Sequence, residues 1–160
     1  MSRCVIPGSF DPVTRGHMDL IRRAAALFDQ VTVVVMINVS KRSCFPAADR
    51  VRMLEKACRA VKNVRVDHWE GLLSEYMREK GEHAVVRGVR SGAEYDAENT
   101  AAQANRMLNP RMETLLLPAG DGLQWVSSSA VREIAAFGGD IRDYVPSECA
   151  EEIAAGLSNK

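Results

Sequence analysis

The segment PGSFDPVTRGH, residues 7–17, holds the residue types best suited to chemistry in this chain. It follows an apolar run at 4–6 and precedes a helical pattern that begins at Met18. A strand therefore leads into a loop rich in glycine, proline and serine, which opens a helix. That geometry points backbone N–H groups and the positive end of a helix dipole at one spot. With Thr14 as N-cap, His17 falls at the third helical position beside this spot.

This arrangement suits a polyanion whose phosphorus is about to react. Gly8 lets backbone approach a ligand closely, and Ser9 offers a hydroxyl. Asp11 is expected to stabilise its own turn. The structural alternative is a histidine packed against the next strand, in a loop that merely turns. The strand–loop–helix context and the polar clusters further along the chain favour the functional interpretation.

Arg87 and Arg90 flank Gly88 directly after the apolar run at 84–86. Arginine binds phosphate oxygens through a two-pronged guanidinium, and glycine permits close backbone approach. The pair is therefore a candidate phosphate site. The alternative is a set of surface ion pairs with carboxylates nearby in sequence, namely Glu94, Asp96 and Glu98.

Two further segments carry groups that could bind phosphate. Residues 127–129 are three consecutive serines at a predicted helix start, where backbone N–H groups are open to an anion. Ordinary serine capping is the alternative, although one serine would suffice for that. Lys41 is either a mobile cation that reaches a phosphoryl oxygen or a solvated loop lysine, and its own segment favours the second interpretation.

Apolar runs alternate with helical patterns along the chain. Strands are expected at 4–6, 31–37, 64–66, 84–86 and 114–117, and helices at 18–28, 51–61, 72–80, 93–108, 127–137 and 147–157. This order predicts a single α/β domain over 1–160, a doubly wound, Rossmann-like, open parallel five-stranded sheet with C-terminal helices. Ligands of such sheets bind beyond the carboxyl ends of the strands. The polar segments that follow the five strands would meet there.

Composition excludes several classes of protein. The 160 residues carry a formal net charge of zero, which argues against a broad nucleic-acid surface. The four cysteines are widely spaced, without metal-site spacing, so reduced thiols in a cytoplasmic protein are the simplest interpretation. No signal-peptide pattern or run of membrane-spanning length is present, and no membrane partner is expected.

Two motifs together resemble a known superfamily. The segment at 7–17 is similar to the (His/Thr)-x-Gly-His region of the nucleotidyltransferase relatives of class I aminoacyl-tRNA synthetases, and residues 127–132 resemble their Ser-Ser-Ser-x-x-Arg motif. The pair at Arg87 and Arg90, Lys41 and the chain length narrow the resemblance to the bacterial phosphopantetheine adenylyltransferase family, over essentially the full chain.

The resemblance implies a reaction in which ATP and 4′-phosphopantetheine give dephospho-coenzyme A and pyrophosphate. It also implies Mg²⁺ held largely by the ATP phosphates, with no metal site made by protein side chains, and a homohexamer. Two alternatives remain open at this point. One is a related nucleotidyltransferase with another phosphate acceptor, and the other is a non-catalytic nucleotide-binding module.

Site residues are likewise implied by the resemblance. The catalytic set is His17, Lys41 and Arg90. The acceptor-binding residues are Ser9, Lys41, Leu73 and Arg87. The ATP-binding residues are Ser9, Phe10, His17, Gly88, Val89, Arg90, Glu98, Leu123, Gln124, Trp125, Val126, Ser127, Ser128 and Ser129. The chain departs from the family pattern at Val39, where many members have proline, and at Ala97, where many have an aromatic residue near the adenine.

Overall fold

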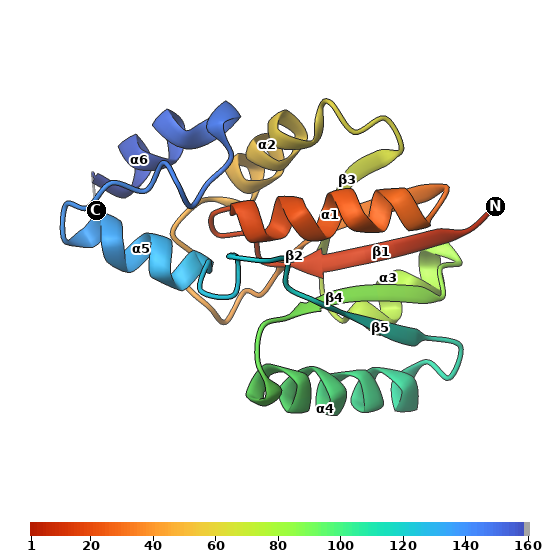
Figure 1. The fold of residues 1–160 in the computed structure, drawn as a ribbon. Coiled ribbons are helices and arrows are strands. Elements are labelled where there is room, and N and C mark those ends of the chain that lie inside the picture. The colour runs from red at the N-terminus through yellow and green to blue at the C-terminus, as the bar shows by residue number, and fades with distance from the viewer. Residues whose placement is uncertain (159–160) are drawn as a thin grey trace.

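Five parallel strands form one sheet at the centre of the molecule (Figure 1). The structure is a computed structural model that describes residues 1–158. The strands are β1 (Arg3–Gly8), β2 (Gln30–Ile37), β3 (Val64–Glu70), β4 (Ala84–Val89) and β5 (Glu113–Pro118). Their order across the sheet is β3-β2-β1-β4-β5, and every neighbouring pair is parallel. The predicted doubly wound sheet is therefore confirmed, and each predicted strand lies inside an observed one.

The helices also follow the sequence pattern. They are α1 (Arg15–Leu27), α2 (Ala47–Cys58), α3 (Leu73–Lys80), α4 (Gly92–Leu108), α5 (Ser128–Ala136) and α6 (Ala150–Ser158). Side chains of Thr14, Ser91 and Ser127 cap three of these helices. Gly81 ends α3 with φ +67°, a backbone conformation that glycine adopts without strain. The helix predicted from Ser147 begins instead as a short 3₁₀ turn, η1 (Ser147–Cys149), as helix N-termini often do.

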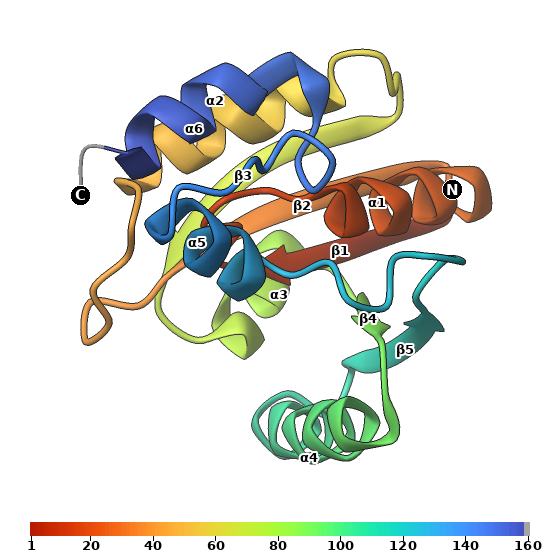
Figure 2. The ribbon, with the colours of Figure 1, turned by 60° about the vertical axis from the view of Figure 1, so that its left-hand side comes forward.

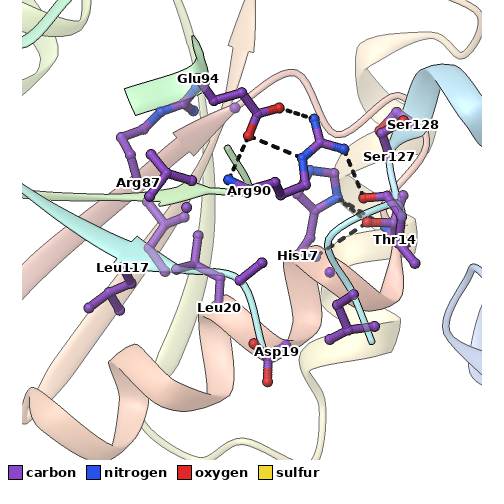
Figure 3. Close-up of a pocket in the computed structure, with 18 of the residues that line it drawn as sticks. Thr14, His17, Asp19, Leu20, Arg87, Arg90, Glu94, Leu117, Ser127 and Ser128 are labelled. Carbon is purple, nitrogen blue, oxygen red and sulfur yellow. Dashed lines mark hydrogen bonds and ion pairs between the residues drawn. The ribbon is translucent and has the colours of Figure 1, made fainter. Parts of the chain in front are cut away.

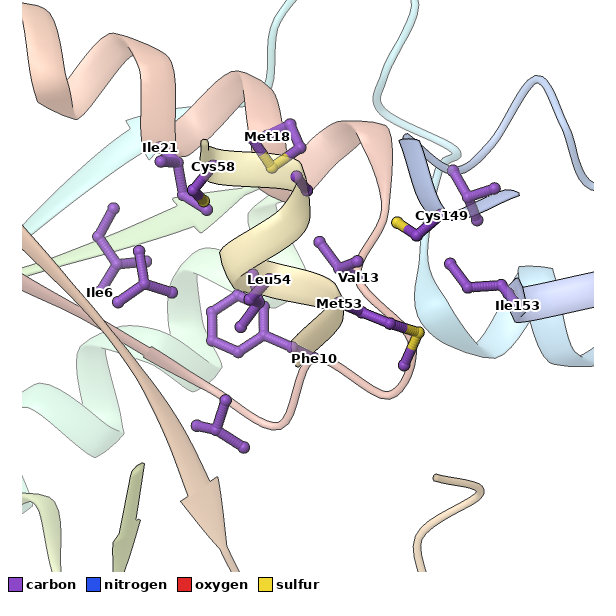
Figure 4. Close-up of a cluster of buried hydrophobic side chains, with 14 of the residues drawn as sticks. Ile6, Phe10, Val13, Met18, Ile21, Met53, Leu54, Cys58, Cys149 and Ile153 are labelled. Carbon is purple, nitrogen blue, oxygen red and sulfur yellow. The ribbon is translucent and has the colours of Figure 1, made fainter. Parts of the chain in front are cut away.

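Alternate residues of the central strands bury on opposite faces of the sheet, because successive side chains of a strand point to opposite sides. In β1, Cys4 and Ile6 join a large core cluster with α1, α2 and α6, while Val5 joins a smaller one beneath α3. Figure 4 shows the large cluster, in which Leu54 and Ile153 are fully buried. The apolar, β-branched run in β2 is thus explained by burial on both faces.

The two covering layers differ in how closely they pack. Helices α2 and α6 lie side by side over one face of the sheet (Figure 2), and Arg52 and Lys56 of α2 both pair with Glu152 of α6. On the opposite face α4 contributes no buried residue. No helix formed by residues 1–158 is both long and apolar enough to cross a membrane.

The chain path places a site between β1 and β4. From β1 the chain proceeds outward to β2 and β3, and then returns to the other side of β1 for β4 and β5. The connections from β1 and from β4 therefore diverge above their carboxyl ends. Open α/β sheets bind ligands in the crevice at this kind of switch point.

Candidate active site

A cavity of about 370 Å³ opens at the carboxyl ends of β1, β4 and β5 (Figure 3). The loop after β1, the first turns of α1, the end of β4, the loop after β5 and the start of α5 form its wall. Thirteen residues named from the sequence lie in this wall: Ser9, Phe10, His17, Arg87, Gly88, Val89, Arg90, Glu98, Leu123, Val126, Ser127, Ser128 and Ser129. Segments that are more than 100 residues apart in the chain thus meet at one place.

A second cavity, of about 360 Å³, lies between α4 and the sheet. Leu73, at the start of α3, lines it, and small α4 residues such as Ala101 leave the space open. The two cavities share a wall that includes Ser9, Arg87 and Glu98. A molecule bound in one cavity therefore meets a molecule bound in the other at Ser9 and Arg87.

The start of α1 fixes the orientation and the tautomer of His17. The Thr14 backbone N–H donates to His17 Nδ1 at 3.0 Å, and the Thr14 hydroxyl accepts from the His17 backbone N–H at 3.3 Å. A backbone N–H is always a donor, so Nδ1 must act as acceptor and the neutral ring carries its proton on Nε2. None of the hydrogen bonds within residues 1–158 uses Nε2. The ring thus offers the cavity an N–H donor.

His17 is neutral over the physiological pH range. Removal of the ring from water, together with the positive charges of Arg87 and Arg90, lowers the pKa of His17 to about 4. Protonation would also place a hydrogen on Nδ1, against the Thr14 N–H. The site therefore holds a fixed neutral donor rather than a proton-transfer group.

The ring of Phe10 packs against the ring of His17. The Phe10 backbone has φ +47°, which directs the ring inward, and the ring packs edge-on to His17 with 4.8 Å between centroids. A Cβ atom at Gly8 would lie 3.0 Å from the Phe10 ring, so a larger residue there would have to displace the ring. The Phe10 side chain is almost wholly buried. Phe10 as a whole residue is only 2% exposed, so it leaves little surface, of ring or of backbone, for a ligand to contact.

Arg87 and Arg90 are both held by carboxylates, as the ion-pair interpretation of their sequence predicted. Arg87 binds Glu98 through Nε at 2.9 Å and through Nη2, and it donates to the Pro7 carbonyl from Nη1. Arg90 binds Glu94 and donates to the Val126 carbonyl at 3.1 Å. A guanidinium has five N–H groups, and these contacts use three in each arginine. Two N–H groups per arginine remain to meet an anion, so pairing and phosphate binding are compatible.

The three serines have separate tasks. Ser127 caps α5 by accepting from the Ala130 N–H at 3.1 Å. Ser128 donates to the Pro12 carbonyl at 2.7 Å, which ties α5 to the loop after β1. Ser129 accepts from Arg132, whose Nη1 donates to the Asp11 carbonyl at 2.6 Å. Ordinary capping therefore accounts for one serine, and the other two fix the position of the helix start.

Three residues named from the sequence lie outside both cavity walls. Lys41 is exposed in the loop after β2, and Gln124 is exposed in the loop after β5. Trp125 is 60% exposed and packs edge-on to Tyr144, with 5.5 Å between ring centroids. The loops after β1, β4 and β5 thus meet at the first cavity, and Leu73, which follows β3, lines the second cavity, while Lys41 lies in neither wall.

Other residues of the first cavity had not been identified from the sequence. Asp19, Leu20 and Arg23 line it from α1, and 117–119 line it from the end of β5. The α1 residues share one helical face with Gly16, at spacings of three, four and seven, and this periodicity could have revealed them. Residues 1–158 contain no cluster of three or more histidine, cysteine, aspartate or glutamate side chains that could hold a metal ion.

Comparison of the sequence with known proteins identifies the family of this chain. Residues 5–134 match the cytidylyltransferase-like family. The chain is 40% identical over 159 residues to a phosphopantetheine adenylyltransferase of Finegoldia magna, covering 99% of this chain and 98% of that protein. It is 45% identical over 153 residues to the enzyme of the same name from Rubrobacter xylanophilus, covering 96% of this chain and 93% of that protein.

Solved structures share the fold at low sequence identity. A bifunctional NMN adenylyltransferase/ADP ribose pyrophosphatase from Francisella tularensis is 13% identical and superposes with a TM-score of 0.74, covering 99% of this chain and 50% of that one. A structure of the same kind of enzyme, complexed with AMP and a manganese ion, superposes with a TM-score of 0.71, with the same identity and coverage. At this identity the likeness concerns the fold alone.

Proposed function

The chain belongs to the cytidylyltransferase-like family and, within it, to the phosphopantetheine adenylyltransferases, and we propose that it transfers the adenylyl group of ATP to 4′-phosphopantetheine. The products are dephospho-coenzyme A and pyrophosphate. The observation that carries this proposal is the pair of cavities that meet at Ser9 and Arg87. One cavity has donors and cations for a nucleotide, and the other is a largely apolar slot for the pantetheine arm.

The reaction needs orientation and charge stabilisation rather than a general base. A phosphate oxygen of phosphopantetheine forms a bond to the α-phosphorus of ATP, and the bond from that phosphorus to the bridging oxygen of pyrophosphate breaks. The nucleophile is already an anion, so no proton has to be removed. Fixed donors placed where charge develops are therefore the main source of catalysis.

His17 is suited to that task. The Thr14 backbone N–H holds the ring in the tautomer that carries Nε2–H, so this donor is in place before substrate binds. We assign it to an oxygen of the α-phosphoryl group. A donor that is positioned in advance does not have to reorganise as the transition state forms, and loss of one such donor costs about 10²- to 10³-fold in kcat.

Cations and backbone N–H groups complete the assignment. Arg90 and the start of α5 face the first cavity and are assigned to the β- and γ-phosphates, where a helix N-terminus favours an anion. Arg87 lies in the wall common to both cavities and is assigned to the acceptor phosphate. Lys41 is assigned to the same phosphate, which it reaches only if its loop moves toward the cavity.

Magnesium enters as part of the ATP complex. The acidic side chains of the first cavity are already engaged, since Glu94 and Glu98 hold arginines and Asp19 lies 3.4 Å from Arg23. This donor set fits a metal carried by the phosphates rather than by a protein cage. When bound, Mg²⁺ neutralises phosphate charge. The manganese ion in the F. tularensis structure supports the use of a divalent metal in this fold.

A homohexamer in the cytoplasm completes the proposal. Helix α4 buries no residue and exposes Tyr95, Met107 and Leu108, a surface that assembly would cover. All four cysteines are free thiols, as suits a reducing compartment. Analytical ultracentrifugation tests the assembly, which should sediment at about six times the 17.6 kDa of one chain. A species of any other size would contradict it.

The reaction itself is tested by pyrophosphate release with different acceptors. We expect release with ATP and 4′-phosphopantetheine, and little with ATP and nicotinamide mononucleotide or with CTP in place of ATP. Activity with another acceptor alone would replace the proposed substrate. ATP binding without pyrophosphate release from any acceptor would indicate a non-catalytic nucleotide-binding module.

A further inference from the structure

The side chain of Asp11 forms hydrogen bonds with a segment far from its own turn. Asp11 is 7% exposed as a whole residue, and its two carboxylate oxygens accept backbone N–H groups of Cys44 at 2.7 Å and of Phe45 at 2.8 Å. These partners lie 33 and 34 residues further along the chain. Asp11 therefore stabilises a second segment beyond the turn to which the sequence assigned it. A charged acceptor with two backbone donors is a strong contact, because both hydrogen bonds are charge-assisted.

Arg50 completes the same connection from α2. Arg50 is 3% exposed as a whole residue, and it donates from Nε to the Phe45 carbonyl at 3.1 Å and from Nη1 to the Ser9 carbonyl at 2.7 Å. Phe45 is thus held at its N–H by Asp11 and at its carbonyl by Arg50. Ser9, which belongs to both cavities, is held by the same arginine. The loop after β1 and the segment at 44–45 form one hydrogen-bonded unit.

The segment at 44–45 is the C-terminal anchor of the loop that carries Lys41. Residues 38–43 are exposed, and the hydrogen bonds described within this loop are local, such as Ser40 to the Asn38 side chain. From Lys41 to Cys44 the chain spans at most about 11 Å. The anchor at 44–45 therefore limits the range of positions that Lys41 can occupy.

We propose that Asp11 and Arg50 are positioning residues that couple the Ser9 loop to the Lys41 loop, so that Lys41 reaches phosphate bound where the two cavities meet. The assignment of Lys41 to phosphate rests on the proposed function, whereas the anchoring of its loop does not. Asp11→Asn is the direct perturbation. An amide has one acceptor oxygen, so its NH₂ group would face a backbone N–H in place of the second acceptor.

Limited proteolysis tests the anchor without reference to activity. Trypsin cleaves after lysine and arginine, and Lys41 and Arg42 are both exposed. We expect Asp11→Asn to increase the cleavage rate after these two residues at least about five-fold, because a released loop opens more often. Asp49→Asn is the matched control. Asp49 lies in the first turn of α2 and pairs with Arg52 at 2.6 Å on the surface, so its loss should leave the rate unchanged.

A double-mutant cycle tests the coupling to Lys41. Asp11→Asn should lower kcat/KM for 4′-phosphopantetheine at least about ten-fold in the native background and less than about two-fold in the Lys41→Ala background. Equal losses in both backgrounds, or cleavage at the native rate, would overturn the proposal. Arg50→Lys, which keeps the charge but loses the planar guanidinium, should act in the same direction if Asp11→Asn does not fold. A native enzyme inactive with phosphopantetheine would refute the proposed function, and proteolysis would still decide the anchoring.

Discussion

The neutral state of His17 predicts how the enzyme responds to pH. Replacement of His17 by alanine should lower kcat by at least about 10²-fold, because it removes one donor fixed in advance. The ratio of native to His17→Ala kcat/KM should then be constant from pH 6 to 9. This parameter reports ionisations of the free enzyme and free substrates. Ionisation of the substrate phosphate, with a pKa near 6, affects both enzymes and cancels in the ratio.

The magnitude follows from the pKa of about 4 that burial and two neighbouring arginines give His17. With that pKa about 99% of the ring is neutral at pH 6. With the ordinary value of 6.5, only about a quarter would be neutral at pH 6 and nearly all at pH 8. A titrating histidine would therefore change the ratio about four-fold between these two pH values, whereas the structure predicts no change.

The assay is initial-rate pyrophosphate release at subsaturating 4′-phosphopantetheine and constant ionic strength. His83→Ala serves as a control for loss of an imidazole, because His83 is exposed at the opposite end of β4. It should retain native kinetics at each pH. A pKa near 6.5 in the ratio would refute the neutral donor, and near-native turnover by His17→Ala would refute its role altogether.

Three further predictions concern packing, pH and capping. Gly8→Ala should lower kcat and should lower the free energy of unfolding by about 1–3 kcal/mol, because the added carbon lies 3.0 Å from the Phe10 ring. Gly92→Ala is the control, since its added carbon meets nothing within 4 Å. In thermal unfolding this control should be neutral or stabilising. The pKa of His17 is about 6.5 in the unfolded chain and about 4 in the folded one, so the unfolded chain takes up a proton first as the pH falls. The contribution of neutral His17 to the free energy of unfolding is therefore fully present above pH 6.5 and falls by about 2–3 kcal/mol as the pH drops to 4. In urea titrations, His17→Ala should therefore lose less stability than the native chain between pH 7 and pH 4.5, and an equal loss would contradict the assignment. Ser127→Ala should cost about 1 kcal/mol in the same titrations by removal of the α5 cap.

Local patterns in the sequence were sufficient to predict the framework. The run 31–37 is apolar at consecutive positions, as a strand buried on both faces requires, and it became β2. Thr14 and His17 stand at the spacing of a cap and its third helical position, and both belong to the capping box of α1. The roles of Thr14 and His17 in this cap depend only on residues within one turn of helix. The order of strands and helices likewise limited the topology to a few choices, because crossover connections are right-handed.

The contents of the site depended on contacts between distant segments. Arg87 could equally have been a surface ion pair or a phosphate ligand, and only the folded chain shows it paired with Glu98 inside the wall shared by two cavities. The hydrogen-bond partners of Asp11 lie 33 and 34 residues further along the chain, and no sequence periodicity predicts a contact at that separation. Lys41 could not be placed at all, since an exposed loop is positioned by its anchors rather than by its own residues.

Sequence alone therefore determined which segments form strands, which residues cap α1 and α5, and that the loops after β1, β4 and β5 share one edge of the sheet. These features follow from short-range sterics and from the alternation of apolar residues. The tertiary structure decided the neutral charge state of His17, the pairing of both arginines and the connection from Asp11 to the Lys41 loop. These depend on burial and on the orientation of groups far apart in the chain, which the folded packing alone brings into contact.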